Sequence, residues 1–215
     1  MRRLSLALAL PIVFTAVPAA ADESFALDVH RWRVIDSQSG PDNYYGVVED
    51  PDGAFIRAAY RPPMETTVLG YELADEVLES ARRVRWSWRA TVLPRAGATC
   101  SNAADAAATV YVAWKRRLRW YVLKYVWAAA LPKGSACERR RNLFVAQDSV
   151  VLETGAAAGV WATEEIDLRA EFRRHFADGD PSADVPDFKG VAIMTDGDDT
   201  ESTSGADYAR FVLIR

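Results

Sequence analysis

The sequence feature that most constrains the fold is a period of two in residues 84–92. Val84, Trp86 and Trp88 alternate with arginine and serine, which is the pattern of a strand with one buried and one solvated face. The tryptophans are therefore predicted to lie in the core and the arginines on the opposite face. The period of 3.6 that marks an amphipathic helix is absent here.

Further short segments share this strand character. They are rich in β-branched and aromatic residues and are separated by turn residues. The predicted strands cover 47–49, 54–57, 109–114, 118–127, 142–146, 149–153, 160–166, 190–195 and 208–214. Asp50-Pro51-Asp52-Gly53 predicts a hairpin, because proline presets φ and glycine supplies the positive φ that closes the turn.

One helix is predicted, over residues 167–177. Asp167 can cap it, and Leu168, Phe172 and Phe176 recur every four residues, so that the helix lies as a short amphipathic lid on the strands. With almost no other helical segment, the chain is predicted to be mainly β, a single-domain antiparallel sandwich of jelly-roll type over residues 22–215.

The first residues predict export. Arg2 and Arg3, an apolar run and the segment 19–21 form a secretory signal, cleaved after Ala21, so we expect a periplasmic or secreted protein. No later run is long enough to cross a membrane. The remaining chain carries 24 basic and 30 acidic residues, a net charge of −6, which makes nucleic acid a poor partner.

The two cysteines, Cys100 and Cys137, are predicted to form a disulfide, because an even number in an exported protein favours pairing. In the chain-entropy model, closing a loop of this length would stabilise the fold by roughly 4 kcal/mol. A catalytic thiol is disfavoured for the same reason.

The usual catalytic patterns are missing, among them the G-x-S-x-G elbow, the P-loop and the H-E-x-x-H motif. Glu164, Glu165 and Glu171 could supply a pair of carboxylates for acid/base work, but their separation in space cannot be read from the sequence. No catalytic residue is assigned, and the balance leans away from an enzyme.

Basic and aromatic residues interleave in two of the predicted strands. Sugar rings stack on aromatic faces while arginine pairs with carboxylate groups, so such strands could hold a polysaccharide. The candidate ligand-binding residues are Arg83, Arg85, Arg89, Tyr121, Lys124 and Tyr125. The tryptophans between them are interpreted as core.

An acidic stretch near the C-terminus offers Asp196, Asp198 and Asp199 as candidate calcium ligands, because hard cations bind carboxylate oxygens presented from a tight turn. The spacing is not that of an EF-hand, and aspartate and glycine are ordinary turn formers. A plain turn without a metal is the favoured interpretation, and no other cofactor is expected.

Several motifs together resemble the bacterial family catalogued as domain of unknown function 3047. They are Arg85-Trp86-Ser87-Trp88 with Leu93-Pro94, Val110-Tyr111-Val112, Leu123-Lys124-Tyr125-Val126-Trp127, Trp161-Ala162-Thr163-Glu164-Glu165 before Phe172, and residues 192–200. The resemblance covers nearly the whole predicted mature chain, and the last motif is its most specific part. It implies an exported protein of undefined activity with a β-sandwich similar to galactose-binding-type modules.

The chain departs from the family pattern at a few polar positions. In the family, a paired Asp and an Arg precede the Val-Tyr-Val strand and an Asn stands at the position of Lys124, whereas this chain has Ala104-Asp105 and Thr109. If these positions form the family's site, this member has altered part of it.

Three functions are compatible with these observations. The leading one is a non-catalytic module that binds a glycan or another envelope component through one sheet face. The second is an enzyme acting on polysaccharide, with Glu164, Glu165, Asp196 and Asp198 or the Tyr121, Lys124 and Tyr125 cluster as candidates. The third is an envelope assembly factor that binds protein, for example by adding a strand to a sheet edge.

Overall fold

The computed structural model describes residues 23–37, 44–95, 105–155 and 159–215, without the side chains of residues 138 and 139. The predicted signal segment 1–21 and Cys100 lie outside the described residues. Cys137 is buried in the described part. The disulfide therefore stays a prediction.

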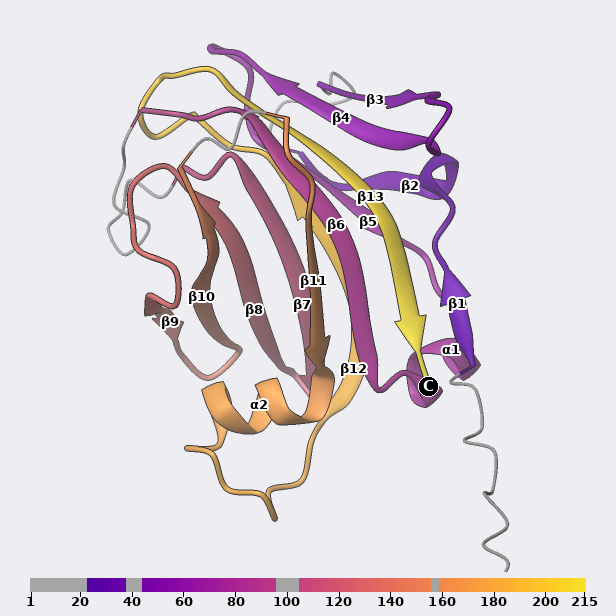
Figure 1. Cartoon of the computed structure of the whole chain (residues 1–215). Coiled ribbons are helices and arrows are strands. Elements are labelled where there is room, and N and C mark those ends of the chain that lie inside the picture. The colour runs from indigo at the N-terminus through magenta and orange to yellow at the C-terminus, as the bar shows by residue number, and fades with distance from the viewer. Residues whose placement is uncertain (1–22, 38–43, 96–104, 156–158) are drawn as a thin grey trace, which may run out of the picture.

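Two β-sheets pack face to face and enclose the core (Figure 1). Sheet A has the order β11-β6-β13-β4-β3, with β1 paired to β13, and sheet B has the order β2-β5-β12-β7-β8-β10-β9. The strands of sheet A are β1 (Ser24–Ala26), β3 (Tyr45–Val48), β4 (Phe55–Tyr60), β6 (Arg83–Val92), β11 (Ala162–Asp167) and β13 (Ser204–Ile214). The strands of sheet B are β2 (Trp32–Ser37), β5 (Thr67–Tyr71), β7 (Ala108–Arg116), β8 (Arg119–Ala128), β9 (Ala136–Arg141), β10 (Val145–Thr154) and β12 (Asp187–Met194).

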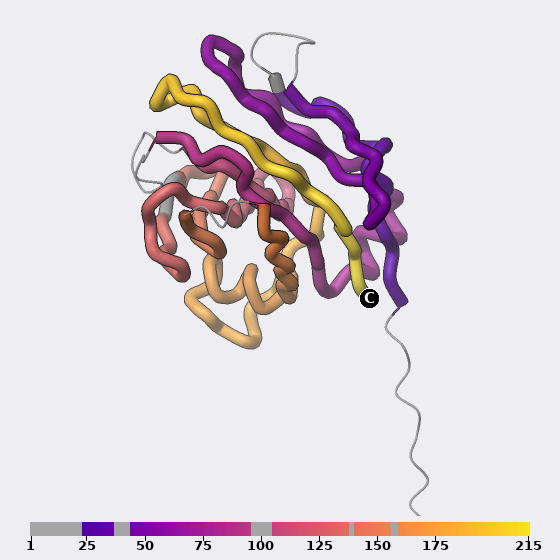
Figure 2. Tube along the Cα trace, turned by 45° about the horizontal axis from the view of Figure 1, so that its top comes forward, coloured from indigo at the N-terminus to yellow at the C-terminus, as the bar shows by residue number. Residues whose placement is uncertain are grey.

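This architecture confirms the predicted mainly β sandwich. β13 lies between β6 and β4 in the middle of sheet A, as Figure 2 shows. The predicted hairpin joins β3 to β4: the amide of Gly53 donates to the carbonyl of Asp50 at 2.9 Å, and Gly53 adopts a φ of 114°.

The strand pairing differs from the prediction at one edge of sheet B. β10 runs parallel to β8, whereas every other pair of described strands is antiparallel. The chain first forms the outer strand β9 and then turns back, so β10 enters between β8 and β9. The strand predicted over 142–146 is wrong in its first half, because the Asn142 side chain accepts from the amides of Phe144 and Val145 and forms a turn there.

The core contains Trp86 and Trp88, which the alternation placed there, together with Trp114 and Trp127. Trp86, Trp88 and Trp114 are 0% exposed, and Trp127 is 2% exposed. Trp88 contacts the edge of Trp127 across the two sheets, with ring centroids 5.8 Å apart. These rings form the centre of the sandwich, and their burial confirms the predicted inward face of β6.

The predicted helix is present as α2 (Leu168–Phe176). Asp167 caps it by accepting from the amides of Arg169 and Ala170 at 2.9 and 2.7 Å. Figure 1 shows α2 across one end of the sandwich, and the ring of Phe172 packs on Trp114 of sheet B.

Two shorter helices were not predicted, the single turn η1 (Val29–Arg31) and α1 (Asp75–Ser80). α1 has six residues, none of them buried, and therefore no apolar repeat long enough to show a helical period. Among the described residues, the helices are too short and too polar to cross a membrane.

Candidate functional site

The outer surface of sheet A carries the predicted arginine row. Because Trp86 and Trp88 point into the core, Arg83, Arg85 and Arg89 point to the opposite side of β6. β4 adds Arg57 to the same surface, since Arg57 and Arg89 are register partners of the same residue of β13. We call this surface the arginine face.

A buried carboxylate organises the arginine face. Asp207 of β13 has a side chain that is 0% exposed and lies between Arg57 and Arg89. Its oxygens accept from Arg57 Nε at 2.8 Å and from Arg89 Nε at 2.7 Å. Two charge-assisted contacts to one buried group hold both guanidinium planes in place.

A second, more exposed carboxylate binds the rest of the row. Glu165 of β11 accepts from Arg83 Nη1 at 2.6 Å and from Arg85 Nε at 2.7 Å. The hydrogen bonds from Arg85 and Arg83 lower the pKa of Glu165. The candidate Glu165 therefore serves here as an ion-pair partner of the arginines.

A pocket of about 260 Å³ opens at one end of the arginine face. Two aromatic rings form part of its wall, and the centroids of Phe55 and Trp161 lie 5.7 Å apart. The guanidinium of Arg89 lies 4.6 Å from the Trp161 ring centroid, and that of Arg210 lies 5.6 Å from it. The pocket thus combines aromatic surface with guanidinium donors. Asp50 and Asp52 of the hairpin turn also line it.

Arg210 reaches this pocket because of a β-bulge. Between Ser87 and Arg85 of β6, β13 advances from Ala209 to Val212 and so holds one extra residue. Arg210 adopts a φ of 54°, which is uncommon for a residue with a side chain. Bulges redirect side chains and backbone strain concentrates at functional sites, so this position points to a function. The bulge could not be predicted from the sequence, because an alternating pattern does not reveal an extra residue.

The two candidate tyrosines lie inside the fold and not on the arginine face. Tyr125 is 1% exposed, and its hydroxyl donates to Glu171 Oε2 at 2.8 Å. Burial, followed by the charge of Glu171, raises the pKa of Tyr125 well above its ordinary value. Tyr121 packs edge-on against Phe172 of α2, with centroids 5.1 Å apart. Both therefore belong to the interior between β8 and α2.

Lys124 lies on the outer surface of sheet B, where its ammonium is 4.9 Å from the ring centroid of Tyr111. The six candidate residues therefore occupy three different places. The arginines share one face, the tyrosines are internal, and the lysine belongs to the other sheet. The grouping of all six on one surface is corrected accordingly.

A network of charged and polar side chains that the sequence did not reveal holds α2 on sheet B. His175 Nδ1 lies 3.3 Å from Asp148 Oδ2, and His175 Nε2 lies 3.7 Å from Glu171 Oε2. Arg141 forms an ion pair with the other oxygen of Asp148. Since these groups come from β9, β10 and α2, they link the helix to the edge of sheet B.

The three glutamates considered for catalysis lie at three different places in the fold. Glu165 lies on the arginine face, Glu164 on the other side of β11, and Glu171 on α2. Burial and the neighbouring charge of Glu153 raise the pKa of Glu164. Glu164 is therefore the member of this trio whose environment suits a proton donor.

The acidic stretch forms a closed loop between β12 and β13. Asp105 is 0% exposed and accepts from the amides of Asp199 and Thr200 at 3.2 and 2.8 Å. Carboxylate oxygens of Asp105, Asp198 and Asp199 lie within 4.8 Å of one another. Asp105 thus lies beside Asp198 and Asp199, two of the three predicted calcium ligands. The hydrogen bonds that Asp105 accepts from the backbone hold the turn of this loop.

Asp196 points elsewhere. Its Oδ1 accepts from Thr66 Oγ1 at 3.1 Å and from the amide of Asp198 at 3.3 Å. Burial, assisted by the neighbouring Asp198, raises the pKa of Asp196 to about 7. Asp196 is not among the carboxylates whose oxygens lie within 4.8 Å of one another, so it does not belong to the group around Asp105.

Comparisons with known structures concern the architecture. The chain is similar to the xyloglucanase domain of NopAA, a type three effector from Sinorhizobium fredii in complex with cellobiose, at 9% identity and a TM-score of 0.47, covering 90% of this chain and 98% of that domain. It is also similar to endoglucanase 3 of Trichoderma harzianum, from family GH12, at 11% identity and a TM-score of 0.38, covering 92% and 98% of the two chains.

In sequence, no curated protein matches the chain. A family model does match it over residues 30–212, a span that runs from η1 to β13. The match includes β6, β13 and the pocket on the arginine face. The chain belongs to the family described as protein of unknown function (DUF3047).

Proposed function

We propose that this protein binds a glycan, without catalysis, at the pocket of the arginine face. The observation that carries the proposal is the position of Arg89 and Arg210 against the ring of Trp161 in one hollow of about 260 Å³. Aromatic surface and a small number of directed polar groups are the usual composition of a ligand pocket.

The chemistry of the pocket suits a sugar. The apolar face of a pyranose ring packs on an aromatic side chain, as Phe55 and Trp161 offer. Its hydroxyl groups can accept from guanidinium N–H groups and donate to the carboxylates of Asp50 and Asp52. A carboxylate on the sugar would pair with arginine.

The pocket is also held in place before a ligand arrives. Asp207, whose side chain is fully buried, forms an ion pair with Arg89. Arg89 Nη1 also donates to the carbonyl of Gly159 at 3.2 Å. A side chain that is already ordered loses less conformational entropy on binding, which improves affinity.

The carboxylates of this pocket favour binding over hydrolysis. Asp50 and Asp52 both lie exposed on the hairpin turn. Glycosidases need one carboxyl group that is kept protonated, which generally requires burial. An exposed pair on a turn meets the needs of hydrogen bonding to hydroxyl groups.

A glycan array followed by calorimetric titration of the best hit tests the proposal. We expect Trp161→Ala to weaken the association by about tenfold or more, the effect of removing a central aromatic contact. Trp120→Ala is the matched control, because Trp120 is 38% exposed on sheet B and should leave binding unchanged. Binding to no glycan, or equal losses in both variants, would overturn the proposal.

A second candidate function is hydrolysis or lytic cleavage of a polysaccharide, and the raised pKa of Glu164 beside Glu153 favours it. In this case the protein would release new reducing ends from a polysaccharide. Glu164→Gln would abolish that activity while Trp161→Ala left turnover of small substrates intact. Binding without any product in prolonged incubations would support the module instead.

Export is part of the proposal, because polysaccharides of the cell envelope lie outside the cytoplasm. The motivation is the signal-like segment 1–21. A fusion of this segment to alkaline phosphatase, which is active only after export, should give active enzyme. A segment with Arg2 and Arg3 replaced and the apolar run interrupted by charges should not.

A further inference from the structure

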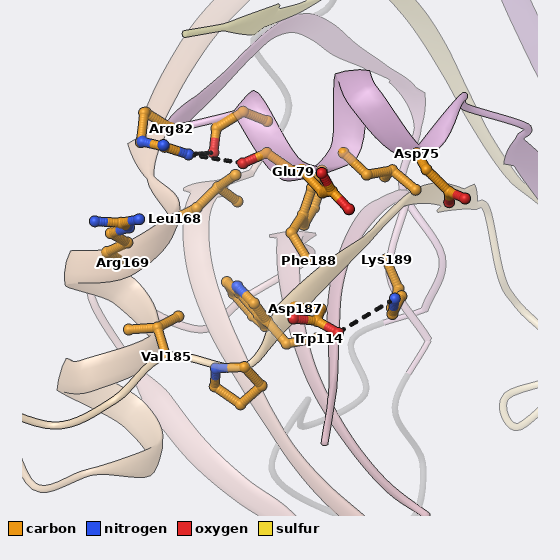
Figure 3. Close-up of a pocket in the computed structure, with 13 residues that line it drawn as sticks. Asp75, Glu79, Arg82, Trp114, Leu168, Arg169, Val185, Asp187, Phe188 and Lys189 are labelled. Atoms are coloured by element: carbon orange, nitrogen blue, oxygen red, sulfur yellow. Dashed lines mark hydrogen bonds and ion pairs between the residues drawn. The ribbon is translucent and has the colours of Figure 1, made fainter. Parts of the chain in front are cut away.

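A separate pocket lies at the end of the sandwich where α1 and α2 meet β12 (Figure 3). Its volume is about 240 Å³, and it shares no residue with the pocket on the arginine face. Its walls come from α1, β7, α2 and β12 and from residues next to α1 and β12. It has no part in the glycan site proposed above.

Three buried apolar residues close the base of this pocket, Trp114 of β7, Leu168 of α2 and Phe188 of β12, which are 0%, 2% and 7% exposed. The aliphatic surface open to a ligand comes from the half-buried side chains of Leu78 and Val185. An apolar group of a ligand would pack there, while its polar groups would need partners on the rim.

The rim carries charges of both signs on different sides. Figure 3 shows Arg82 and Arg169 together on the side of α2, with Asp75 and Glu79 along α1. Arg82 Nη1 donates only to backbone carbonyls, of Glu79 at 3.0 Å and of Ala81 at 3.1 Å. The positive and negative groups thus face the pocket mouth from opposite directions.

These charges are not neutralised by one another. In the described part of the chain, neither arginine forms an ion pair, and the carboxylates of Asp75 and Glu79 have no cationic partner. Lys189 on the β12 side is engaged with Asp187 at 3.6 Å. Two guanidinium groups and two carboxylates are therefore available to a ligand.

We propose that this pocket binds a small zwitterion with an apolar side chain, namely a free amino acid with an aromatic or large aliphatic side chain. The carboxylate of the ligand would pair with Arg82 and Arg169, its ammonium group with Asp75 and Glu79, and its side chain would pack against Leu78 and Val185. The volume equals that of about eight water molecules, which suits one ring.

Calorimetric titration of the full chain with L-phenylalanine tests this proposal. Two blocked analogues separate the contributions of the charges: N-acetyl-L-phenylalanine lacks the ammonium group, and L-phenylalanine amide lacks the carboxylate. We expect each to bind about tenfold or more weakly, which is the effect of losing a hydrogen bond to a charged group. No binding of L-phenylalanine or L-leucine at millimolar concentration, or equal binding of the analogues, would overturn the proposal.

Variants then place the site. Arg169→Ala should weaken binding of L-phenylalanine and Glu79→Gln likewise, each by about tenfold. Arg174→Ala on the same helix and Glu76→Gln on α1 are the matched controls, because neither lines the pocket. Equal losses in the controls would count against the assignment, and the blocked analogues keep the test decisive on the unaltered protein if a variant fails to fold.

Discussion

β6 and β8 are both strands of ten residues with aromatic and basic side chains, and they contribute to the molecule in different ways. On β6 the basic residues share one face and the tryptophans the other, so Arg85 is solvated and Trp86 is buried. On β8 the tyrosines share the inward face with leucine, while the basic Lys124 points outward over Tyr111.

The difference shows what interleaved aromatic and basic residues mean on a strand. Where alternation is strict, as on β6, it assigns each residue to a face. Tyrosine suits either face, since a buried hydroxyl needs only one partner, and Glu171 supplies it for Tyr125. The candidate binding residues of β6 therefore share one surface, whereas those of β8 are divided between the interior and the outer surface.

The largest expected effect compares the two sides of β8. Tyr125→Ala should lower the free energy of unfolding by about 3–5 kcal/mol, because it removes a buried aromatic ring and leaves a cavity. Lys124→Ala should change it by no more than about 0.5 kcal/mol. Urea unfolding of both variants measures the two values. Similar values would mean that Tyr125 is not a core residue and would restore the tyrosines as candidates for a binding surface.

The next effect compares the two carboxylates of the arginine face. Asp207→Asn should cost about 1–3 kcal/mol, because two guanidinium groups lose charge-assisted contacts with a buried partner. Glu165→Gln should cost only about 0.2–1 kcal/mol, since its ion pairs are more exposed to water. Thermal and urea unfolding of the two variants checks the order, and the reverse order would show that Asp207 does not organise this face.

A smaller effect concerns the helix that covers Tyr121. Asp167→Ala should destabilise the protein by about 1 kcal/mol, because two amides in the first turn of α2 lose their acceptor. Asp184→Ala is the control, since the side chain of Asp184 is 89% exposed. Hydrogen exchange should speed up at α2 and not at β6. Equal acceleration of exchange at α2 and β6 would indicate that the helix does not open independently of the sandwich.

The smallest effect concerns pH and two neighbouring residues of β11. Glu164 has a raised pKa, so the folded state binds more protons than the unfolded state, and its contribution to stability declines as the pH rises through the raised value. Glu165 has a lowered pKa, so its contribution is present above the unfolded pKa and is lost as the pH falls through the lowered value.

Unfolding of the Glu164→Gln and Glu165→Gln variants, measured at pH values below and above the pKa of glutamate in the unfolded chain, gives both contributions. The difference in stability between the protein and each variant should change with pH in opposite directions. Changes in the same direction would show that both glutamates lie in the same kind of environment. That result would contradict their placement on opposite sides of β11.

Much of the architecture follows from local patterns. The hairpin at Asp50–Gly53, the strand β6 and the capped helix α2 each have a signal that a few consecutive residues carry. α1 was missed because six residues are too few to show a helical period, and the parallel pairing of β10 with β8 because pairing partners are not local in sequence.

The candidate site could be predicted only in part. The alternation on β6 placed Arg89 on an outer face, which the structure shows. The sequence offered no sign that Phe55, Trp161 and Arg210 come to that arginine, because they belong to β4, the segment before β11 and a bulge in β13. No sequence pattern distinguished Asp207 from the other acidic residues of the C-terminal third.

The sequence by itself determined which side chains share a face, because the direction of a side chain on a strand depends only on its position along that strand. Only the tertiary structure decided which residues from separate strands adjoin. These outcomes depend on the order of strands in the sheets, on one extra residue at Arg210 and on the helix laid over Tyr121. Each is a property of contacts between distant segments, which no local pattern encodes.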